Sequence, residues 1–191
     1  MLPHASCYCE ENAYLALRAL GGDARERHAV FCTSDARQTV FWGHRRGGSA
    51  VIWDYHVFVV ERRDDGGWYV LDHDADVCRL SEGDSDGCRS VAWVPFGAYE
   101  RACLAPPDDD AWRELAAARR FRPVRAADLL QRFASDRGHM RLPDGGWSAP
   151  PPPWPAIGAS PPRARPLTLS DLLASGPDYE ADGAWRGQLL G

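Results

Sequence analysis

Two apolar runs separated by a short polar loop constrain the fold of this chain more than any other feature. The first run extends from Val51 to Glu61 and the second from Trp68 to Asp72, and the loop between them ends in two glycines. β-branched and aromatic residues in runs of this length favour strands, and a short loop rich in aspartate and glycine joins antiparallel neighbours. The sequence therefore predicts a β-hairpin over residues 51–72.

Shorter patterns on either side of the hairpin predict the remaining elements. Tyr14, Leu17 and Leu20 share one stripe of a helix predicted over residues 10–20, which ends at Gly21. Further strands are predicted at 29–33, 38–42 and 121–125, and further helices at 96–104, 109–120, 128–134 and 170–174. A helix followed by strands and then by helices is the order of an α+β fold with a mostly antiparallel sheet and helices packed on it.

The length of 191 residues is that of one ordinary domain. We therefore expect residues 1–191 to form a single domain. A proline-rich segment at about 145–162 is expected to pack on it, because Trp147, Trp154 and Ile157 need burial. The alternative for this segment is an exposed ligand of the SH3 type.

Charge and apolar patterning exclude several classes of partner. The net charge is -5 and the chain has no lysine, so no basic stripe indicates binding to nucleic acid. No segment reaches the ~18 consecutive apolar residues that cross a membrane. The start lacks the pattern of a signal peptide, so we expect a cytoplasmic protein with reduced thiols, and a nuclear location is allowed as well. The six cysteines show no paired C-x2-C spacing, which argues against a metal site.

Cys9 is the strongest candidate for a reactive group. It stands directly before Glu10 and Glu11 at the start of the first predicted helix. Unpaired backbone N–H groups and the positive end of the helix dipole favour a thiolate there, although the two glutamates oppose it. Cys7 is the rival nucleophile, but it lies outside the predicted helix start. The structural alternative for Cys9 is a small buried apolar residue.

His56 lies inside the first strand of the hairpin and is the candidate base. Alternation along a continuous strand predicts that Val51, Trp53, Tyr55, Val57 and Val59 face one way. Asp54 and His56 should face the other way, together with Ile52, Phe58 and Val60. A core histidine satisfied by one hydrogen bond is the alternative.

The register of the hairpin decides which carboxylate meets His56. If the loop comprises residues 62–66, Asp72 lies opposite His56; a three-residue loop of residues 64–66 puts Asp74 there instead. A carboxylate in either place would fix the imidazole tautomer and stabilise its charged form. The hairpin supports an Asp–His pair without choosing between the two aspartates. Residues 136–140 are equally compatible with a site wall and with a solvated loop.

Several stretches in fixed order resemble the protein N-terminal glutamine amidohydrolase family. They are Ser6 to Asn12, Val51 to Val57, Leu71 to Asp74, Phe133 to Met140 and Pro150 to Ile157. The resemblance implies a papain- or transglutaminase-like cysteine hydrolase core. It also implies that Cys9 is the nucleophile, His56 the base and Asp72, rather than Asp74, the third member of a catalytic triad.

The same resemblance implies the reaction. We expect deamidation of an N-terminal glutamine side chain to glutamate and ammonia through a thioester, with no cofactor and no metal, by a monomer. In the family's setting, the new glutamate can be arginylated and mark the substrate for degradation. The alternatives are a papain-like cysteine peptidase, a transglutaminase, and a non-enzymatic reader of protein N-termini.

Recognition of a free N-terminus requires partners for its α-ammonium group. Asp54, Glu10 and Glu11 are the acidic residues nearest in sequence to the candidate nucleophile and base. Asp54 ranks first because it is two residues from His56 on the same predicted strand face. Glu10 and Glu11 lie in the first helical turn, where either one can simply offset the helix dipole.

Overall fold

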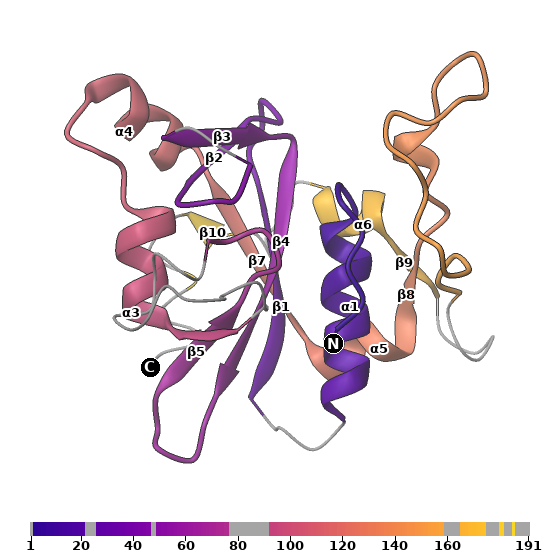
Figure 1. The fold of residues 1–191 in the computed structure, drawn as a ribbon, viewed down its shortest axis with the longest axis horizontal. Coiled ribbons are helices and arrows are strands. Elements are labelled where there is room, and N and C mark those ends of the chain that lie inside the picture. Colours follow the sequence, from indigo (N-terminus) through magenta and orange to yellow (C-terminus); the bar gives the residue numbers. More distant parts are fainter. Residues whose placement is uncertain are drawn as a thin grey trace.

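A six-stranded antiparallel sheet forms the centre of the computed structural model, which describes residues 2–21, 26–46, 49–76, 92–158, 165–174, 180–181 and 185. The strand order is β10-β7-β1-β4-β5-β6 (Figure 1). These strands are β1 (Arg27–Thr33), β4 (Tyr55–Arg62), β5 (Trp68–Leu71), β6 (Trp93–Pro95), β7 (Arg120–Arg125) and β10 (Glu180–Ala181). Two small sheets flank it: β2 (Thr39–Trp42) with β3 (Ala50–Trp53), and the parallel pair β8 (Phe133–Ala134) with β9 (Leu167–Thr168).

Helices cover both faces of the central sheet (Figure 1). One face carries α1 (Cys9–Leu20), α5 (Ala126–Arg132) and α6 (Leu169–Leu173), and the other carries α3 (Phe96–Tyr99), which continues into a π-helical turn at Glu100–Leu104. The other helices in the described residues are α4 (Asp110–Ala117), which packs on β2, and a 3-10 turn at Gly138–Met140. The predicted α+β class with a mostly antiparallel sheet is confirmed. No helix in the described part of the chain is long and apolar enough to span a membrane.

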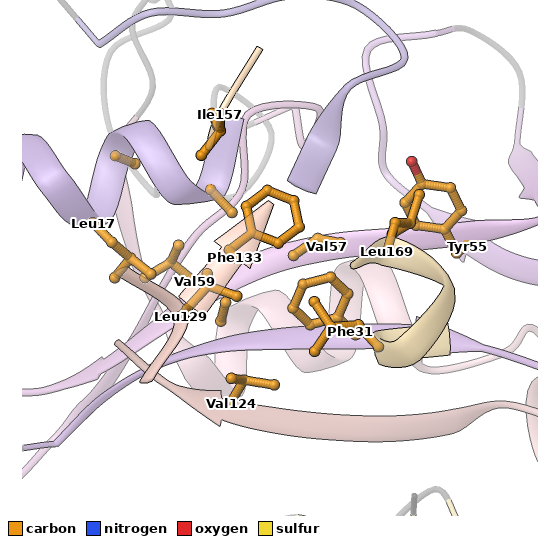
Figure 2. Close-up of a cluster of buried hydrophobic side chains, with 14 of the residues drawn as sticks. Leu17, Phe31, Tyr55, Val57, Val59, Val124, Leu129, Phe133, Ile157 and Leu169 are labelled. Carbon is orange, nitrogen blue, oxygen red and sulfur yellow. The ribbon is translucent and has the colours of Figure 1, made fainter. Parts of the chain in front are cut away.

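Alternating side chains of β4 supply both apolar cores. Tyr55, Val57 and Val59 pack under α1 against Leu17 and Phe133 (Figure 2). Phe58 and Val60 face the opposite core, which contains Val30, Phe96 and Tyr99 together with Trp185. Because β4 is buried on both faces, its sequence reads as an almost continuous apolar run.

The strand predicted over 51–61 is broken at Asp54. Asp54 Oδ1 accepts a hydrogen bond from the Tyr55 backbone N–H at 3.1 Å, and the Asp54 carbonyl accepts one from Thr33 Oγ1 at 2.8 Å. These two hydrogen bonds interrupt the ladder, so β3 pairs with β2 while β4 pairs with β1. The predicted alternation fails across the break: Val51 and Trp53 pack with the core of Phe58, not with that of Tyr55.

Strand pairing also differs from the chain order at the start of the sheet. The predicted strands at 29–33 and 38–42 are present but do not pair with each other, because β1 lies between β4 and β7. The hairpin of β4 and β5 is confirmed, and Arg62 pairs with Trp68. Its register is that of the three-residue loop, with the Arg63 N–H bonded to the Gly67 carbonyl at 3.0 Å.

The proline-rich segment contacts the α1 side of the sheet within the described residues. Ile157 belongs to the core under α1, and its carbonyl accepts a hydrogen bond from the Ser135 N–H at 2.8 Å (Figure 2). Trp154 bonds to Glu11 of α1 through its indole N–H at 2.7 Å. Residues 159–162 of the predicted segment lie outside the described residues.

Candidate active site

A cavity of about 310 Å³ opens where α1 begins beside β4. Its wall includes Cys9, Asp54 and His56, three residues that the sequence singles out. Cys7 and Asp74, the alternatives considered for the nucleophile and the third member, also line it. The remaining wall residues are Arg46, Trp53, Tyr55, His139, Met140, Ser148 and Ala149. One cavity therefore brings together a thiol, an imidazole and an exposed carboxylate.

Cys9 occupies the first position of α1, one residue earlier than predicted. Asn12, one turn later, holds the preceding segment: its side chain accepts from the Ala5 N–H and donates to the Ala5 carbonyl, both at 2.8 Å. Cys9 is partly exposed to the cavity. Burial, followed by the charge of Glu10, raises the pKa of the Cys9 thiol well above its ordinary value. The helix start does not outweigh these effects, so the thiol of the free protein is protonated at neutral pH.

His56 and Asp72 form a buried hydrogen-bonded pair. His56 Nε2 and Asp72 Oδ2 are 2.9 Å apart. Burial alone would raise the pKa of the Asp72 carboxyl, but the charges of His56 and His44 and hydrogen bonds from His56 and Tyr99 hold it well below its usual range. An ionised carboxylate can only accept, so Nε2 carries the proton of the neutral ring. Nδ1 of His56 is then the nitrogen able to take a proton.

Burial alone would lower the pKa of His56. The charge of Asp72 and the hydrogen bond to it outweigh burial and raise the pKa above the ordinary value. The pair therefore favours a charged imidazole during a reaction, which is what a base needs after it accepts a proton.

Asp72 meets His56 by a route that neither hairpin count describes. In the observed register Asp74 would lie opposite His56, but the β5 ladder ends at Leu71. Beyond that point the chain turns, and Asp72 Oδ1 accepts a hydrogen bond from the Asp74 N–H at 2.9 Å. The Asp72 side chain thus reaches His56 diagonally, while Asp74 lies 3.9 Å from His4 Nε2 through its own Oδ1.

Further side chains hold the His56–Asp72 pair. Tyr99, at the end of α3, donates its hydroxyl to Asp72 Oδ2 at 2.7 Å. Trp53 stacks on the His56 ring with centroids 4.6 Å apart, and Phe41 meets it edge-on at 4.9 Å. His44 Nε2 lies 3.6 Å from Asp72 Oδ2, and burial lowers the pKa of His44 to about 4. Sequence reasoning missed Tyr99, Phe41 and His44, because no local pattern links them to residues 56 and 72. It placed Trp53 on the strand face opposite His56, which is wrong.

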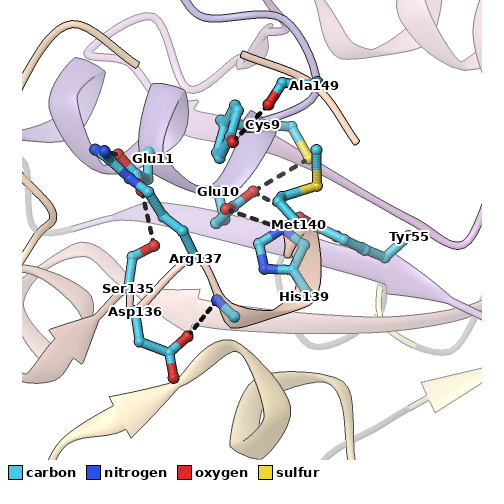
Figure 3. A network of polar contacts seen from close by, with 12 residues as sticks. Cys9, Glu10, Glu11, Tyr55, Ser135, Asp136, Arg137, His139, Met140 and Ala149 are labelled. Atoms are coloured by element: carbon cyan, nitrogen blue, oxygen red, sulfur yellow. Dashed lines mark hydrogen bonds and ion pairs between the residues drawn. The ribbon is translucent and has the colours of Figure 1, made fainter. Parts of the chain in front are cut away.

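Glu10 is buried behind the cavity wall. Its Oε2 accepts a hydrogen bond from the Tyr55 hydroxyl at 2.7 Å, and that hydroxyl also lies 3.1 Å from His139 Nε2 (Figure 3). Burial raises the pKa of Glu10 to about 7, in spite of the Tyr55 hydrogen bond. Glu10 Oε2 also lies 3.9 Å from the Cys9 sulfur. Tyr55 and His139, rather than Glu10, reach the cavity.

Glu11 is engaged in a buried ion pair away from the cavity. Arg137 donates to both carboxylate oxygens, at 2.8 and 2.9 Å, and Ser135 Oγ donates to Oε1 at 2.7 Å (Figure 3). The Trp154 indole donates to Oε2 at 2.7 Å. The structure thus places Glu11 with the 135–154 segment instead of among the cavity-lining residues. Asp54, by contrast, is exposed and lies in the cavity wall.

Comparison with known proteins identifies the family of this chain. A family model described as N-terminal glutamine amidase matches residues 4–175. Protein N-terminal glutamine amidohydrolase of Caenorhabditis briggsae is 32% identical over 157 residues, which cover 81% of this chain and 77% of that protein. The Homo sapiens protein of the same name is 30% identical over 182 residues, which cover 91% of this chain and 78% of that protein. The Arabidopsis thaliana protein of the same name is 31% identical over 164 residues, which cover 81% of this chain and 67% of that protein. The chain belongs to the N-terminal glutamine amidase family.

Proposed function

We propose that this protein deamidates the side chain of N-terminal glutamine on proteins or peptides, giving N-terminal glutamate and ammonia. The observation that carries the proposal is the cavity in which Cys9, at the start of a helix, is joined by His56 with its Asp72 partner. The family match and the names of the relatives give the reaction and the substrate.

Cys9, His56 and Asp72 act in this proposal as nucleophile, base and orienting residue. His56 Nδ1 takes the thiol proton while the Cys9 sulfur attacks the carboxamide carbon of the substrate. The N–H of Cys9 has no acceptor within its own helix and stabilises the developing oxyanion. His56 then returns the proton to the nitrogen as the C–N bond breaks and ammonia leaves, which gives a γ-glutamyl thioester.

Hydrolysis of the thioester completes the cycle. His56 Nδ1 accepts a proton from water, the hydroxide attacks the thioester carbon, and the C–S bond breaks. The sulfur regains the proton from His56, and N-terminal glutamate is released. Asp72 stays ionised throughout and stabilises the imidazolium formed in each half.

The raised pKa of Cys9 fits recognition of a positively charged substrate. Burial and the charge of Glu10 hold the thiol protonated in the free protein. An α-ammonium group in the cavity adds an opposite charge and lowers the cost of forming the thiolate. Deprotonation then accompanies substrate binding, and the free enzyme does not carry a permanently reactive thiolate.

Asp54 is the residue that we propose for the α-ammonium group. It is exposed in the cavity wall, and the bond from Tyr55 N–H occupies only one of its two oxygens among the described residues. Glu10 contributes its charge from behind Tyr55, and Glu11 remains the weakest candidate because Arg137 neutralises it. Asp54→Asn should raise KM for a free-amine peptide more than it lowers kcat.

The wider setting is part of the same proposal. We infer a cytoplasmic monomer with a papain- or transglutaminase-like catalytic domain, whose product enters degradation by the N-degron route. Gel filtration coupled to light scattering checks the monomer. A dimer at working concentration would overturn that part alone.

The decisive experiment is incubation with a peptide that begins with glutamine, followed by mass spectrometry and an ammonia assay. We expect the mass gain of deamidation and one ammonia released per peptide. An N-acetylated peptide and a peptide with glutamine at its second position should not react. Peptide cleavage would indicate a peptidase, amine crosslinking a transglutaminase, and binding without conversion a non-enzymatic reader. Cys9→Ala should abolish turnover; activity retained there would move the nucleophile to Cys7.

A further inference from the structure

His44 is a buried histidine that takes no part in the proton transfers of the proposed reaction. It follows β2 and is only 6% exposed, and its ring lies against Trp53 and Phe41 with centroids 4.9 and 5.3 Å away. Neither ring nitrogen has a hydrogen-bond partner among the described residues. A buried imidazole without hydrogen-bond partners is costly in free energy, so the burial of His44 needs a physical reason.

The side chains near His44 provide a set of metal-ligand atoms. One nitrogen each of His44 and His56 and one oxygen of Asp72 lie within 4.8 Å of one another, and all three side chains are buried. Asp72 Oδ2 is 2.9 Å from His56 Nε2 and 3.6 Å from His44 Nε2. Ligands of a tetrahedral zinc ion with bonds of ~2.0–2.1 Å lie about 3.3 Å apart, between these two distances.

We propose that His44, His56 and Asp72 form a binding site for a zinc-class divalent cation. Two imidazole nitrogens and one carboxylate suit zinc or its close transition-metal neighbours, whereas magnesium and calcium require shells made of oxygen. The sequence argued against a zinc site on cysteine spacing, and this site uses histidine and aspartate. The cation reaches it from the cavity, whose wall includes His56.

Occupancy of the site stops the reaction proposed above. The cation binds the Nε2 lone pair of His56, and the single proton of the neutral ring moves from Nε2 to Nδ1. Nδ1 then carries the ring proton and can no longer accept one from Cys9. The site acts as a reversible off-switch, not as a cofactor site. The inhibition rests on the proposed function, but the binding does not.

Direct binding measurements separate the two claims. Both cavity thiols are removed in a Cys7→Ala/Cys9→Ala protein, which is titrated with zinc chloride by calorimetry and with cobalt chloride by visible absorption. We expect one strong zinc site and the absorption bands of tetrahedral cobalt. His44→Phe in the same background keeps an aromatic ring between Trp53 and Phe41 and should weaken zinc binding at least about tenfold. Magnesium should not bind measurably.

The matched control is His28→Ala in the same background. His28 also has a buried ring nitrogen without a hydrogen-bond partner among the described residues, but it lies on β1 opposite Val60 of β4, away from Asp72. Zinc affinity should stay unchanged in this variant. Equal zinc affinity with and without His44 would overturn the proposal, as would the absence of a zinc site in the Cys7→Ala/Cys9→Ala protein. If the wild-type protein does not deamidate the glutamine peptide but has a His44-dependent zinc site, that result would count only against the proposed function.

Discussion

The side chain of Asp72 makes more hydrogen bonds to described residues than the side chain of Cys9 or His56 does. One of its oxygens receives hydrogen bonds from both His56 and Tyr99, and the other receives the Asp74 N–H. A carboxylate buried in this way is stabilised by its donors, and each donor also fixes its direction. By holding Asp72, Tyr99 also fixes the orientation of His56, so Tyr99 is a positioning residue for the base.

Tyr99→Phe tests this positioning role. The substitution keeps the ring and removes one donor to Asp72, so the fold should persist while kcat falls about tenfold, or ~1.4 kcal/mol, with little change in KM. Tyr69→Phe is the matched control, because the Tyr69 hydroxyl donates to the exposed Asp65 at 2.8 Å far from the cavity. Steady-state kinetics on the glutamine peptide measures both variants. An unchanged kcat in Tyr99→Phe would contradict the positioning role.

Glu10→Gln tests the buried carboxyl beside Cys9. The pKa of Glu10 is about 7 in the fold, above its ordinary value of 4.5, so the folded state retains a proton that the unfolded chain releases. This contribution to stability is fully present below pH ~4.5 and is lost as pH rises through about 7. Glutamine keeps the acceptor for Tyr55 without ionising. The free energy of unfolding of Glu10→Gln, relative to wild type, should therefore increase between pH 5 and pH 8, by on the order of 2 kcal/mol.

Urea unfolding at the two pH values measures that difference. Glu26→Gln is the control, since Glu26 is an exposed partner of Arg62 on the surface. Its effect on stability should change little with pH. A Glu10→Gln effect equal at pH 5 and pH 8 would mean that Glu10 ionises normally.

At the scale of elements, local sequence patterns predict which helices and strands form, but not always which strands pair with each other. The helix that begins at Cys9 and the strands of the hairpin follow from apolar stripes and apolar runs in the local sequence. The break at Asp54 depends on a hydrogen bond from Thr33, which is distant in sequence. Pairing of β1 with β4 and β7 is likewise set by the apolar cores on both faces and not by the nearest turn.

The site divides in the same way. A helix start, a strand and a family resemblance predict Cys9, His56 and Asp72 as site residues; the cavity contains the first two, and Asp72 bonds to the second. The hairpin count leaves both Asp72 and Asp74 open, and the observed register would place Asp74 opposite His56 only if β5 continued beyond Leu71. Tyr99 and His44 were missed because they come from a helix and a loop that tertiary packing alone brings to Asp72.

Asn12→Ala tests how α1 is held at its start. The Asn12 amide makes two hydrogen bonds to Ala5 and is fully buried, so its loss leaves a backbone donor and acceptor of the segment before Cys9 unsatisfied. We expect a loss of about 1–3 kcal/mol in urea unfolding, together with a lower kcat/KM. Asn12→Asp, which keeps the acceptor for the Ala5 N–H, should retain more activity than Asn12→Ala. Equal activity of Asn12→Ala and wild type would show that the two hydrogen bonds between Asn12 and Ala5 do not position Cys9.

At the scale of the whole molecule, the cavity depends on chain segments far apart in sequence. One wall is formed by His139, Met140, Ser148 and Ala149, and the Tyr8 hydroxyl donates to the Ala149 carbonyl at 3.2 Å. The Glu11–Arg137 ion pair joins α1 to this wall, and Arg137 also donates to the Trp154 carbonyl. Arg137 adopts a left-handed backbone conformation, with φ at 57°, which only strong surrounding contacts sustain.

Arg137→Met tests this connection. Removing the guanidinium leaves the Glu11 carboxylate buried without its charge partner, which should cost about 3–5 kcal/mol of unfolding free energy. The Glu11→Gln/Arg137→Met double variant should recover part of that loss, because no unpaired charge remains. Arg125→Met is the control: its ion pair with Asp128 is exposed, so its loss should cost less than about 1 kcal/mol. KM for the glutamine peptide should rise in Arg137→Met as the wall carrying His139 and Met140 loosens. If Arg137→Met cost no more stability than Arg125→Met, the ion pair would not be what holds this wall to α1.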